Sequence, residues 1–199
     1  MTRRQLFALC AAAFAALKWP RWTYAQDREY ERAVAAGFAR FAGTAGAKAR
    51  IAPESEPGTP LRIRGTLYHA DGVSPLAGAL VFAYHTDRAG LYNNDNAAHA
   101  WRLQGAARTG ADGRFEFETI RPASYPSTRI PQHVHVSLST PEGRYHAGEW
   151  RFDDDPMLSD QERAASARAG TFGWVCPVTA QGGRAEIAVN VKVKPETRF

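Results

Sequence analysis

The sequence predicts a mainly β protein: an antiparallel β-sandwich with an N-terminal helix and short helical excursions. From residue 61 onward, short runs of β-branched and aromatic residues alternate with clusters of Gly, Pro and Asp. With 199 residues and 44% hydrophobic content, the chain can bury one sizeable core and has little material for a second. We therefore expect one β-sandwich domain.

Six segments have the length and composition of strands, and turn-forming residues bound each of them. Several short strands at such intervals are typical of a sandwich with antiparallel pairing. The predicted strands are Leu61–Tyr68, Ala79–His85, Gly113–Thr119, His133–Thr140, Tyr145–Phe152 and Ala185–Val193.

Two further segments are predicted to be helical. Aromatic and apolar residues recur at helical spacing within Asp27–Phe41, which indicates an amphipathic helix on the outside of the domain. Leu158–Ala167 has the composition of a second helix, with Ser159 and Asp160 in the position of a cap. The chain thus divides into an export segment at 1–25, an N-terminal helix and linker at 26–60, and the sandwich domain at 61–199.

The first 25 residues have the features of an export signal. A charged start with Arg3 and Arg4 precedes an apolar run from Leu6 to Leu17, and small residues near Ala25 offer a cleavage site. The string from residue 2 to residue 7, TRRQLF, resembles a twin-arginine signal; the alternative is an ordinary Sec signal. We expect a periplasmic or secreted protein. The apolar run is too short to span a bilayer, so we expect no stable membrane anchor.

The charge of the chain is concentrated in this segment. The formal net charge is +5, but four of the 25 Lys and Arg residues and none of the 20 acidic residues lie within residues 1–25. The remaining chain carries 21 basic and 20 acidic residues, and it has no basic run interleaved with aromatic residues. We therefore expect no nucleic-acid partner.

The two cysteines predict no internal disulfide. Cys10 lies in the export segment, which leaves Cys176 alone in the mature chain. A buried, small apolar role for Cys176 is favoured over a nucleophilic role.

The most informative motif is His133-Val134-His135. In a strand, residues two apart point to the same face, so both imidazoles would lie side by side with the valine on the other face. Imidazole suits iron, copper, zinc and nickel, so this pair indicates a metal site without choosing the metal.

Two tyrosines accompany this pair. Tyr92 follows the turn that begins at Asp87, and Tyr125 stands eight residues before His133. Pro126 restricts Tyr125 to an extended backbone, which favours a fixed direction of the phenol. Either tyrosine alone would be interpreted as a half-buried aromatic residue.

Together, the segments Val81–Tyr92, Asp112–Pro126 and His133–His135 resemble the intradiol ring-cleavage dioxygenases, which include protocatechuate 3,4-dioxygenase and catechol 1,2-dioxygenase. The resemblance covers roughly residues 60–156. It implies that Tyr92, Tyr125, His133 and His135 bind Fe(III), with Tyr125 as the axial ligand that leaves when substrate arrives.

This resemblance also implies the reaction. The enzyme would open an aromatic 1,2-diol with O2 between the two hydroxyl carbons and yield a cis,cis-muconate-type diacid. Phenolates stabilise the ferric state, so such a centre is suited to activating the organic substrate rather than reducing O2 directly. No organic cofactor or external reductant would be needed. A departing Tyr125 phenolate could accept a proton from the diol.

Two further residues are candidates for the pocket. Arg129 lies four residues before His133, close to where family members carry an arginine that stabilises negative charge on the ring; a solvent-exposed arginine is the alternative. Glu149 aligns with a glutamine that protocatechuate enzymes have near the oxygen pocket; a strand-edge acid is the alternative. His85 is a weaker candidate for substrate contact, and Tyr84 is predicted to be a packing residue.

Two alternatives remain at this point. The turn pattern from Pro75 to Tyr125 also occurs in transthyretin-like and carboxypeptidase-regulatory-like modules, which bind without catalysis. A periplasmic copper or zinc protein could use His133 and His135, although neither metal prefers two phenolates.

The resemblance also suggests how the protein assembles. The intradiol family often assembles through helices at the chain start, so Asp27–Phe41 is a candidate homodimer interface.

Overall fold

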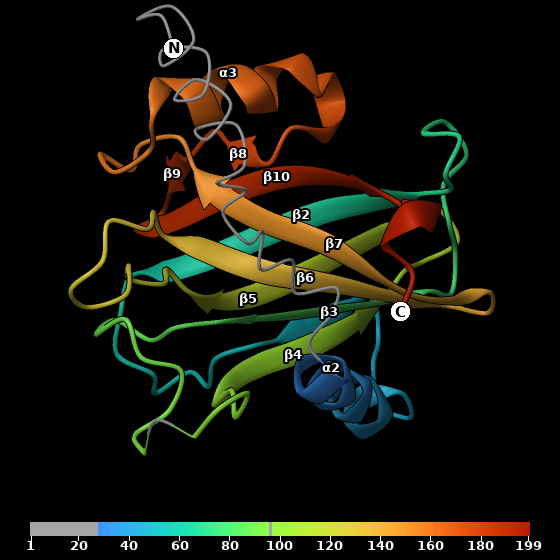
Figure 1. Ribbon diagram of the computed structural model, residues 1–199, viewed down its shortest axis with the longest axis horizontal. Helices are drawn as coiled ribbons and strands as arrows, with labels where there is room; N and C mark the ends of the chain where they lie inside the picture. The colour runs from blue at the N-terminus through green and yellow to red at the C-terminus, as the bar shows by residue number, and fades with distance from the viewer. Residues whose placement is uncertain (1–27, 96) are drawn as a thin grey trace, which may run out of the picture.

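Two five-stranded sheets face each other in a computed structural model that describes residues 28–95 and 97–199 (Figure 1). We call them sheet A and sheet B. The strands of sheet A, in spatial order, are β1 (Lys48–Arg50), β5 (Arg114–Ile120), β2 (Pro60–Tyr68), β10 (Arg184–Lys192) and β9 (Thr179–Gln181). Those of sheet B are β4 (Leu103–Arg108), β3 (Leu80–His85), β6 (His133–Thr140), β7 (Gly143–Phe152) and β8 (Val175–Cys176).

The predicted fold class is confirmed, and each of the six predicted strands is present within two residues of its expected ends. Four strands were not predicted: β1, β4, β8 and β9. They are short or, like β4 with its sequence LQGAAR, poor in β-branched residues, so pairing with a neighbour decides their conformation. Three pairings are parallel, β1 with β5, β2 with β10 and β7 with β8, so each sheet is mixed.

Alternation along the strands of sheet B produces two apolar clusters. Val81 and Ala83 of β3 point into the main core between the sheets. Leu80, Phe82 and Tyr84 of the same strand point outward, where they form a second cluster with helix α2 (Arg28–Phe41). The outer face of sheet B is therefore covered near β3 rather than exposed to water (Figure 1).

Helix α2 confirms the amphipathic segment predicted there. Tyr30, Val34, Gly37 and Phe38 form its buried face, and this face packs against sheet B of the same chain. A homodimer interface on this helix, which stays a prediction, would have to use its exposed face.

The second predicted helix is α3 (Asp160–Arg168). Ser159 is its N-cap and forms a capping box with Glu162, as the predicted position of the cap indicated. Two short 3-10 helices, η2 (Gly170–Phe172) and η3 (Pro195–Thr197), complete the elements of the described residues. The predicted buried, apolar role of Cys176 is confirmed, and burial raises the pKa of its thiol to about 12.

The predicted export segment, residues 1–25, lies outside the described residues. Across residues 28–95 and 97–199, no helix combines the length and the apolar character that a membrane crossing needs. The predicted linker contains more structure than expected: β1 pairs with β5, and Ile51 and Ala52 are buried in the main core.

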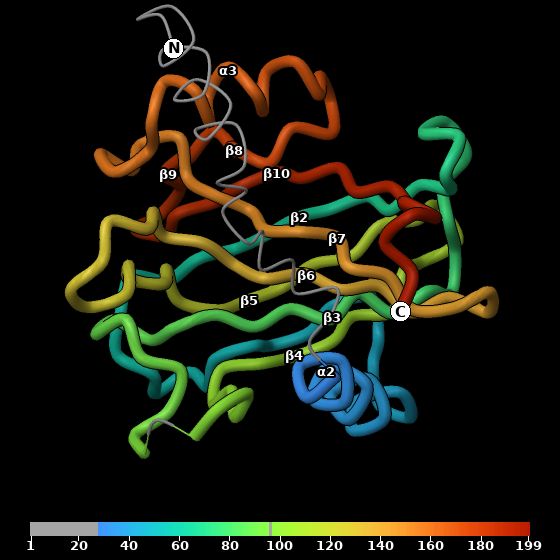
Figure 2. The backbone as a smooth tube through the Cα atoms, viewed as in Figure 1, coloured from blue at the N-terminus to red at the C-terminus, as the bar shows by residue number. Residues whose placement is uncertain are grey.

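The loops that follow β3 and precede β6 lie at the same end of sheet B (Figure 2). This follows from the antiparallel pairing of the two strands, in which Tyr84 is opposite His135 near the end of β3 and the start of β6. The fold therefore brings the predicted tyrosine loops and the predicted histidine strand together.

Candidate metal centre

β6 supplies two histidines on its outer face. Val134 and Val136 point into the main core, so His133 and His135 point to the opposite face, as the strand period predicts. The side chains of both histidines are almost fully buried, with 5% and 4% of each residue exposed. Their Nε2 atoms lie 3.1 Å apart.

The Nδ1 atom of each ring, on the side away from the other histidine, already has a partner. Nδ1 of His133 lies 2.7 Å from the carbonyl oxygen of Pro131, and Nδ1 of His135 lies 3.4 Å from Oε1 of Glu149. The Pro131 carbonyl only accepts hydrogen bonds, so the ring proton of His133 belongs on Nδ1, and the carboxylate beside Nδ1 of His135 favours the same tautomer there. Each Nε2 therefore presents a lone pair toward the other.

Tyr92 is placed by a tight turn after β3. The Asp87 carboxylate accepts hydrogen bonds from the amides of Ala89 (2.8 Å) and Leu91 (3.1 Å), which closes the turn just before the tyrosine. Arg102 donates its amide to the Tyr92 carbonyl (2.8 Å) and its guanidinium to Asp87 (3.2 Å). Tyr92 is therefore fixed on both sides by local bonds.

Tyr125 comes from the loop between β5 and β6, which is attached to the first loop. The Thr86 hydroxyl donates to the Ala123 carbonyl (2.6 Å), and the Ala123 amide donates to the Asp87 carbonyl (3.1 Å). Beyond Tyr125 the loop runs over the surface, and residues 126–130 are all exposed.

Gly90 allows the two tyrosine loops to come into close contact. Its φ is +81°, and a Cβ added there would lie 2.1 Å from the carbonyl oxygen of Ser124 and 3.0 Å from the ring of Pro126. Only a residue without a side chain permits this conformation and this close approach. The contact places the two tyrosine loops side by side.

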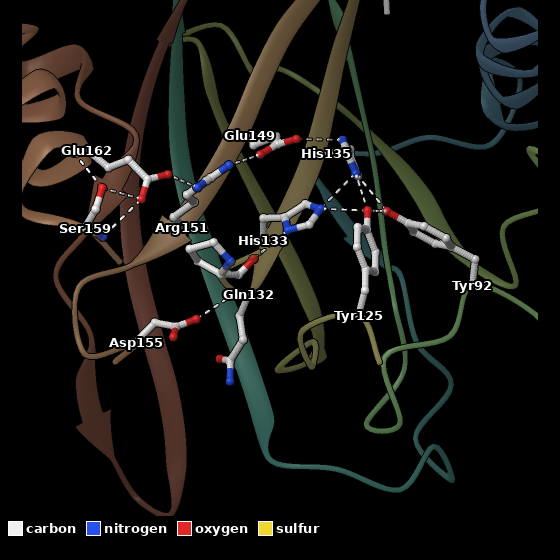
Figure 3. Close-up of polar contacts among 11 residues, drawn as sticks. Tyr92, Tyr125, Gln132, His133, His135, Glu149, Arg151, Asp155, Ser159 and Glu162 are labelled. Carbon is white, nitrogen blue, oxygen red and sulfur yellow. Dashed lines mark hydrogen bonds and ion pairs between the residues drawn. The ribbon is translucent and has the colours of Figure 1, made fainter. Parts of the chain in front are cut away.

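The four predicted ligands converge (Figure 3). Tyr125 Oη lies 2.9 Å from His133 Nε2 and 3.4 Å from His135 Nε2, and Tyr92 Oη lies 2.8 Å from His135 Nε2. The two phenol oxygens are also in hydrogen-bond contact with each other. We call these four atoms the donor cluster.

The chemistry of the donor cluster fits a cation. With the ring protons on Nδ1, the two Nε2 atoms would face each other as lone pairs 3.1 Å apart, an arrangement that a cation between them would stabilise. The phenol oxygens become anionic donors when they lose their protons. Two phenolates and two imidazoles form a hard, electron-rich set, which suits ferric iron better than copper or zinc. Tyr92, Tyr125, His133 and His135 would hold the ion.

The surroundings of His135 favour a neutral ring. Burial is the largest influence and lowers the pKa of His135 to about 3. Tyr84 stacks on the imidazole with ring centroids 4.6 Å apart and 12° between the planes, and Trp101 stacks on the far side of Tyr84 at 3.8 Å. Tyr84 is thus a packing residue, as predicted, and its packing limits rotation of His135.

Glu149 stands behind His135 rather than in the donor cluster. His135 and Glu149 are cross-strand partners on β6 and β7, and one carboxylate oxygen faces Nδ1 on the side of the ring away from the tyrosines (Figure 3). Burial alone would raise the pKa of Glu149, but His135, His133 and the hydrogen bond from Arg151 together lower it. The residue does not reach the cluster directly.

Arg129, the second predicted pocket residue, is exposed on the loop between Tyr125 and His133. Within the described part of the chain it has no hydrogen bond or ion pair that connects it to the donor cluster. Its role in stabilising charge on the ring stays a prediction.

The sequence reasoning missed the residues that hold the start of β6. Asp155 is 1% exposed and accepts hydrogen bonds from the amides of Gln132 (2.7 Å) and Met157 (2.8 Å). Arg121 binds the Gln132 side chain (2.7 Å) and forms a bidentate ion pair with Asp154. Asp154 and Asp155 belong to a run of three aspartates at 153–155, and the position of these acids directly after the end of β7 is the signal for this anchoring role in the sequence.

His85 is structural. Its Nδ1 lies 2.6 Å from the Thr86 carbonyl and its Nε2 lies 2.6 Å from the Thr119 hydroxyl, so both nitrogens are satisfied. The second contact joins β3 of sheet B to β5 of sheet A. Burial lowers the pKa of His85 to about 4.

A β-sandwich with two tyrosine and two histidine donors at one end of a sheet defines the class: a non-haem metal protein of the intradiol type. A model of the family described as "Dioxygenase" matches residues 35–189, which is more than half of the chain. The chain therefore belongs to the intradiol dioxygenase family, which is iron-dependent.

Known relatives agree with this assignment. The chain is 28% identical to catechol 1,2-dioxygenase 1 of Acinetobacter lwoffii over 171 residues, covering 76% of this chain and 53% of that protein. It is 31% identical to catechol 1,2-dioxygenase 2 of the same organism over 129 residues, covering 56% of this chain and 46% of that protein. The chain thus spans about half the length of these relatives.

Among solved structures, the dioxygenase domain of a dioxygenase and carbohydrate-binding protein fusion from Streptomyces sp. SirexAA-E has the same fold. It superimposes with a TM-score of 0.58 at 22% identity, covering 75% of this chain and 89% of that one.

Proposed function

We propose that this protein is an exported, non-haem Fe(III) intradiol dioxygenase that opens catechol-type 1,2-diols with O2 to cis,cis-muconate-type diacids. The observation that carries the proposal is the donor cluster, in which Tyr92, Tyr125, His133 and His135 converge with both Nε2 lone pairs directed inward. Relatives named catechol 1,2-dioxygenases support the substrate class. A transthyretin-like binding module does not require this convergence.

Fe(III) held by these four residues would supply a Lewis acid that binds the diol and makes its ring reactive toward O2. The two tyrosines supply the proton acceptor and the lasting phenolate donor. Tyr125 Oη lies within 3.4 Å of both imidazole nitrogens, and its loop continues into exposed residues, so this phenolate can leave the cluster and accept a proton from the diol. Tyr92, bound on both sides by its own turn, keeps its place.

The absorption spectrum of iron-loaded protein tests this function. A broad phenolate-to-iron band should appear, and it should shift when catechol is added under nitrogen. Admission of labelled O2 should then give a diacid that contains both oxygen atoms. A protein that stays colourless with one equivalent of iron, or that prefers copper or zinc when offered all three metals, contradicts the proposal.

Tyr92→Phe and Tyr125→Phe separate the two phenolates. Both variants should lose intensity in the visible band. We expect Tyr92→Phe to lose the catechol complex as well, whereas Tyr125→Phe should still bind catechol because this ligand is the one proposed to leave. Equal behaviour of the two variants would contradict the assigned roles.

The export part of the proposal rests on the composition of residues 1–25. Replacing Arg3 and Arg4 by lysine should retain the protein in the cytoplasm if the twin-arginine route is used. Unchanged export would favour the Sec route, and cytoplasmic location of the unaltered protein would contradict export by either route.

A further inference from the structure

The two histidines of the donor cluster have different partners behind them. Nδ1 of His133 faces a neutral backbone carbonyl, that of Pro131, at 2.7 Å. Nδ1 of His135 faces a carboxylate, that of Glu149, at 3.4 Å. The pairing of β6 with β7 produces this contact, because His135 and Glu149 are opposite each other on the same face.

An ion pair with Arg151 holds the Glu149 carboxylate in place. Arg151, two residues further along β7, lies 3.0 Å from the other oxygen of Glu149. The guanidinium also contacts Glu162, whose second oxygen accepts hydrogen bonds from the amide (3.1 Å) and the hydroxyl (2.9 Å) of Ser159. The chain of contacts runs from the histidine to the first turn of α3 (Figure 3).

These side chains are sheltered enough for their charges to matter. The side chains of Arg151, Glu149 and Glu162 are 17%, 23% and 32% exposed, and that of His135 is 5% exposed. Charge interactions in such surroundings are screened less than at an open surface. The negative charge of the Glu149 carboxylate therefore reaches the imidazole of His135 with little screening by water.

We propose that Glu149 is a positioning residue for the metal: it fixes His135 with its proton on Nδ1 and makes its Nε2 a stronger donor, while Arg151 and Glu162 hold the carboxylate in register. This inference rests on the proposed function. A carboxylate behind a ligating histidine fixes the tautomer and raises ligand basicity. The centre thus has one ordinary and one strengthened nitrogen ligand.

The test compares Glu149→Gln with the unaltered protein. Glutamine retains the size and an accepting oxygen but removes the charge. We expect iron affinity to fall by about 10- to 100-fold, the range for partners behind metal ligands. The phenolate-to-iron band should move to longer wavelength and the Fe(III)/Fe(II) midpoint potential should rise, because a weaker nitrogen donor leaves the ferric ion more electron-poor.

Glu186→Gln is the matched control. Glu186 lies on β10 of sheet A, where it pairs with Arg64 at 2.8 Å, and its side chain is 17% exposed. It resembles Glu149 in burial and in pairing with arginine but lies in the other sheet. The band, the potential and the affinity should not change in this variant.

A measurement without a variant or a metal covers the case in which Glu149→Gln does not fold. In metal-free protein labelled with 15N-histidine, His135 should show a protonated Nδ1 and a bare Nε2. The opposite tautomer overturns the inference.

The outcomes separate this inference from the proposed function. Unaltered protein without an iron band would contradict the function. Unaltered protein with the band, together with a folded Glu149→Gln that has the same band, potential and affinity, overturns the positioning role alone and leaves a simple strand-edge ion pair.

Discussion

His133 and His135 reach the donor cluster from the middle of a sheet, whereas Tyr92 and Tyr125 reach it from loops. β6 pairs with β3 on one side and β7 on the other, so the spacing of the imidazoles is set by the pleat. The phenols depend on turns closed by side-chain and amide hydrogen bonds. The two histidine donors are therefore fixed by the sheet itself, whereas a tyrosine donor on a loop can be released without disturbing the sheet.

The largest effect on iron binding is expected from replacing a histidine on β6. His135→Ala removes one of the two imidazole donors, so stoichiometric iron and the visible band should both be lost. The fall in affinity should exceed about 100-fold, since partners behind ligands already contribute about 10- to 100-fold. Metal analysis and titration with iron measure this. Retained coloured iron would contradict the assignment of His135.

Gly90→Ala breaks the contact between the two loops. The left-handed φ and the overlap of a new Cβ with the Ser124 carbonyl should together lower the free energy of unfolding by about 2–5 kcal/mol. Iron binding should weaken as the phenols move apart. Urea unfolding of the metal-free protein and iron titration provide the measurements.

Gly78→Ala is the control for Gly90→Ala. Gly78 has a similar φ of +73°, but a Cβ there meets nothing within 4 Å. This variant should show only the cost of the left-handed backbone, about 1–2 kcal/mol, with normal iron binding. Equal losses in the two variants would show that the loop contact is unimportant.

His85, at the junction of strand and loop, should make stability depend on pH. The pKa of His85 is lowered from 6.5 to about 4 by burial, so the folded state holds the neutral ring and the unfolded state takes up the proton first. This contribution is complete above about pH 6.5 and is lost as the pH falls toward 4, with a limit of roughly 3 kcal/mol. The free energy of unfolding of the metal-free protein, measured between pH 4 and 7, should show it.

His85→Gln should reduce the slope of that pH profile while it lowers stability at neutral pH, and the buried His135 should account for the slope that remains. Should the slope between pH 4 and 6.5 stay the same in the variant, another group is responsible.

The smallest effect is expected far from the loops. Ser159→Ala removes the N-cap of α3 and should cost about 1 kcal/mol in the free energy of unfolding. The visible band should change little, because Glu162 retains Arg151 as a partner. Thermal unfolding and the spectrum check both points, and a large change in the band would mean that α3 supports the centre more directly than the contacts indicate.

Much of this arrangement could be predicted from local patterns. The alternation of His133 and His135 with buried valines follows from the strand period alone, and Ser159 is recognisable as a cap from its place before a helical stretch. β4 could not be predicted, because LQGAAR has no strong preference and is extended only by pairing with β3. Arg129 was the residue suggested by sequence position, yet it is exposed.

The contacts behind the cluster depend on register. Nothing near His135 in the sequence identifies Glu149 as its partner, since the contact requires β7 to pair with β6 in one alignment across a bulge between Val136 and Ser137. Asp155 and Arg121 hold the start of β6 from segments on either side of it in the sequence, which meet only in the folded chain.

The sequence by itself determined the sandwich class and the direction of both histidines, because strand period and turn chemistry are local properties, and its resemblance to a known family implied the four candidate ligands. The tertiary structure decided that the four donor atoms meet, that Gly90 joins the tyrosine loops, and that a carboxylate stands behind His135. These depend on pairing between residues distant in the chain, and the energy of such contacts exists only once both sheets have formed.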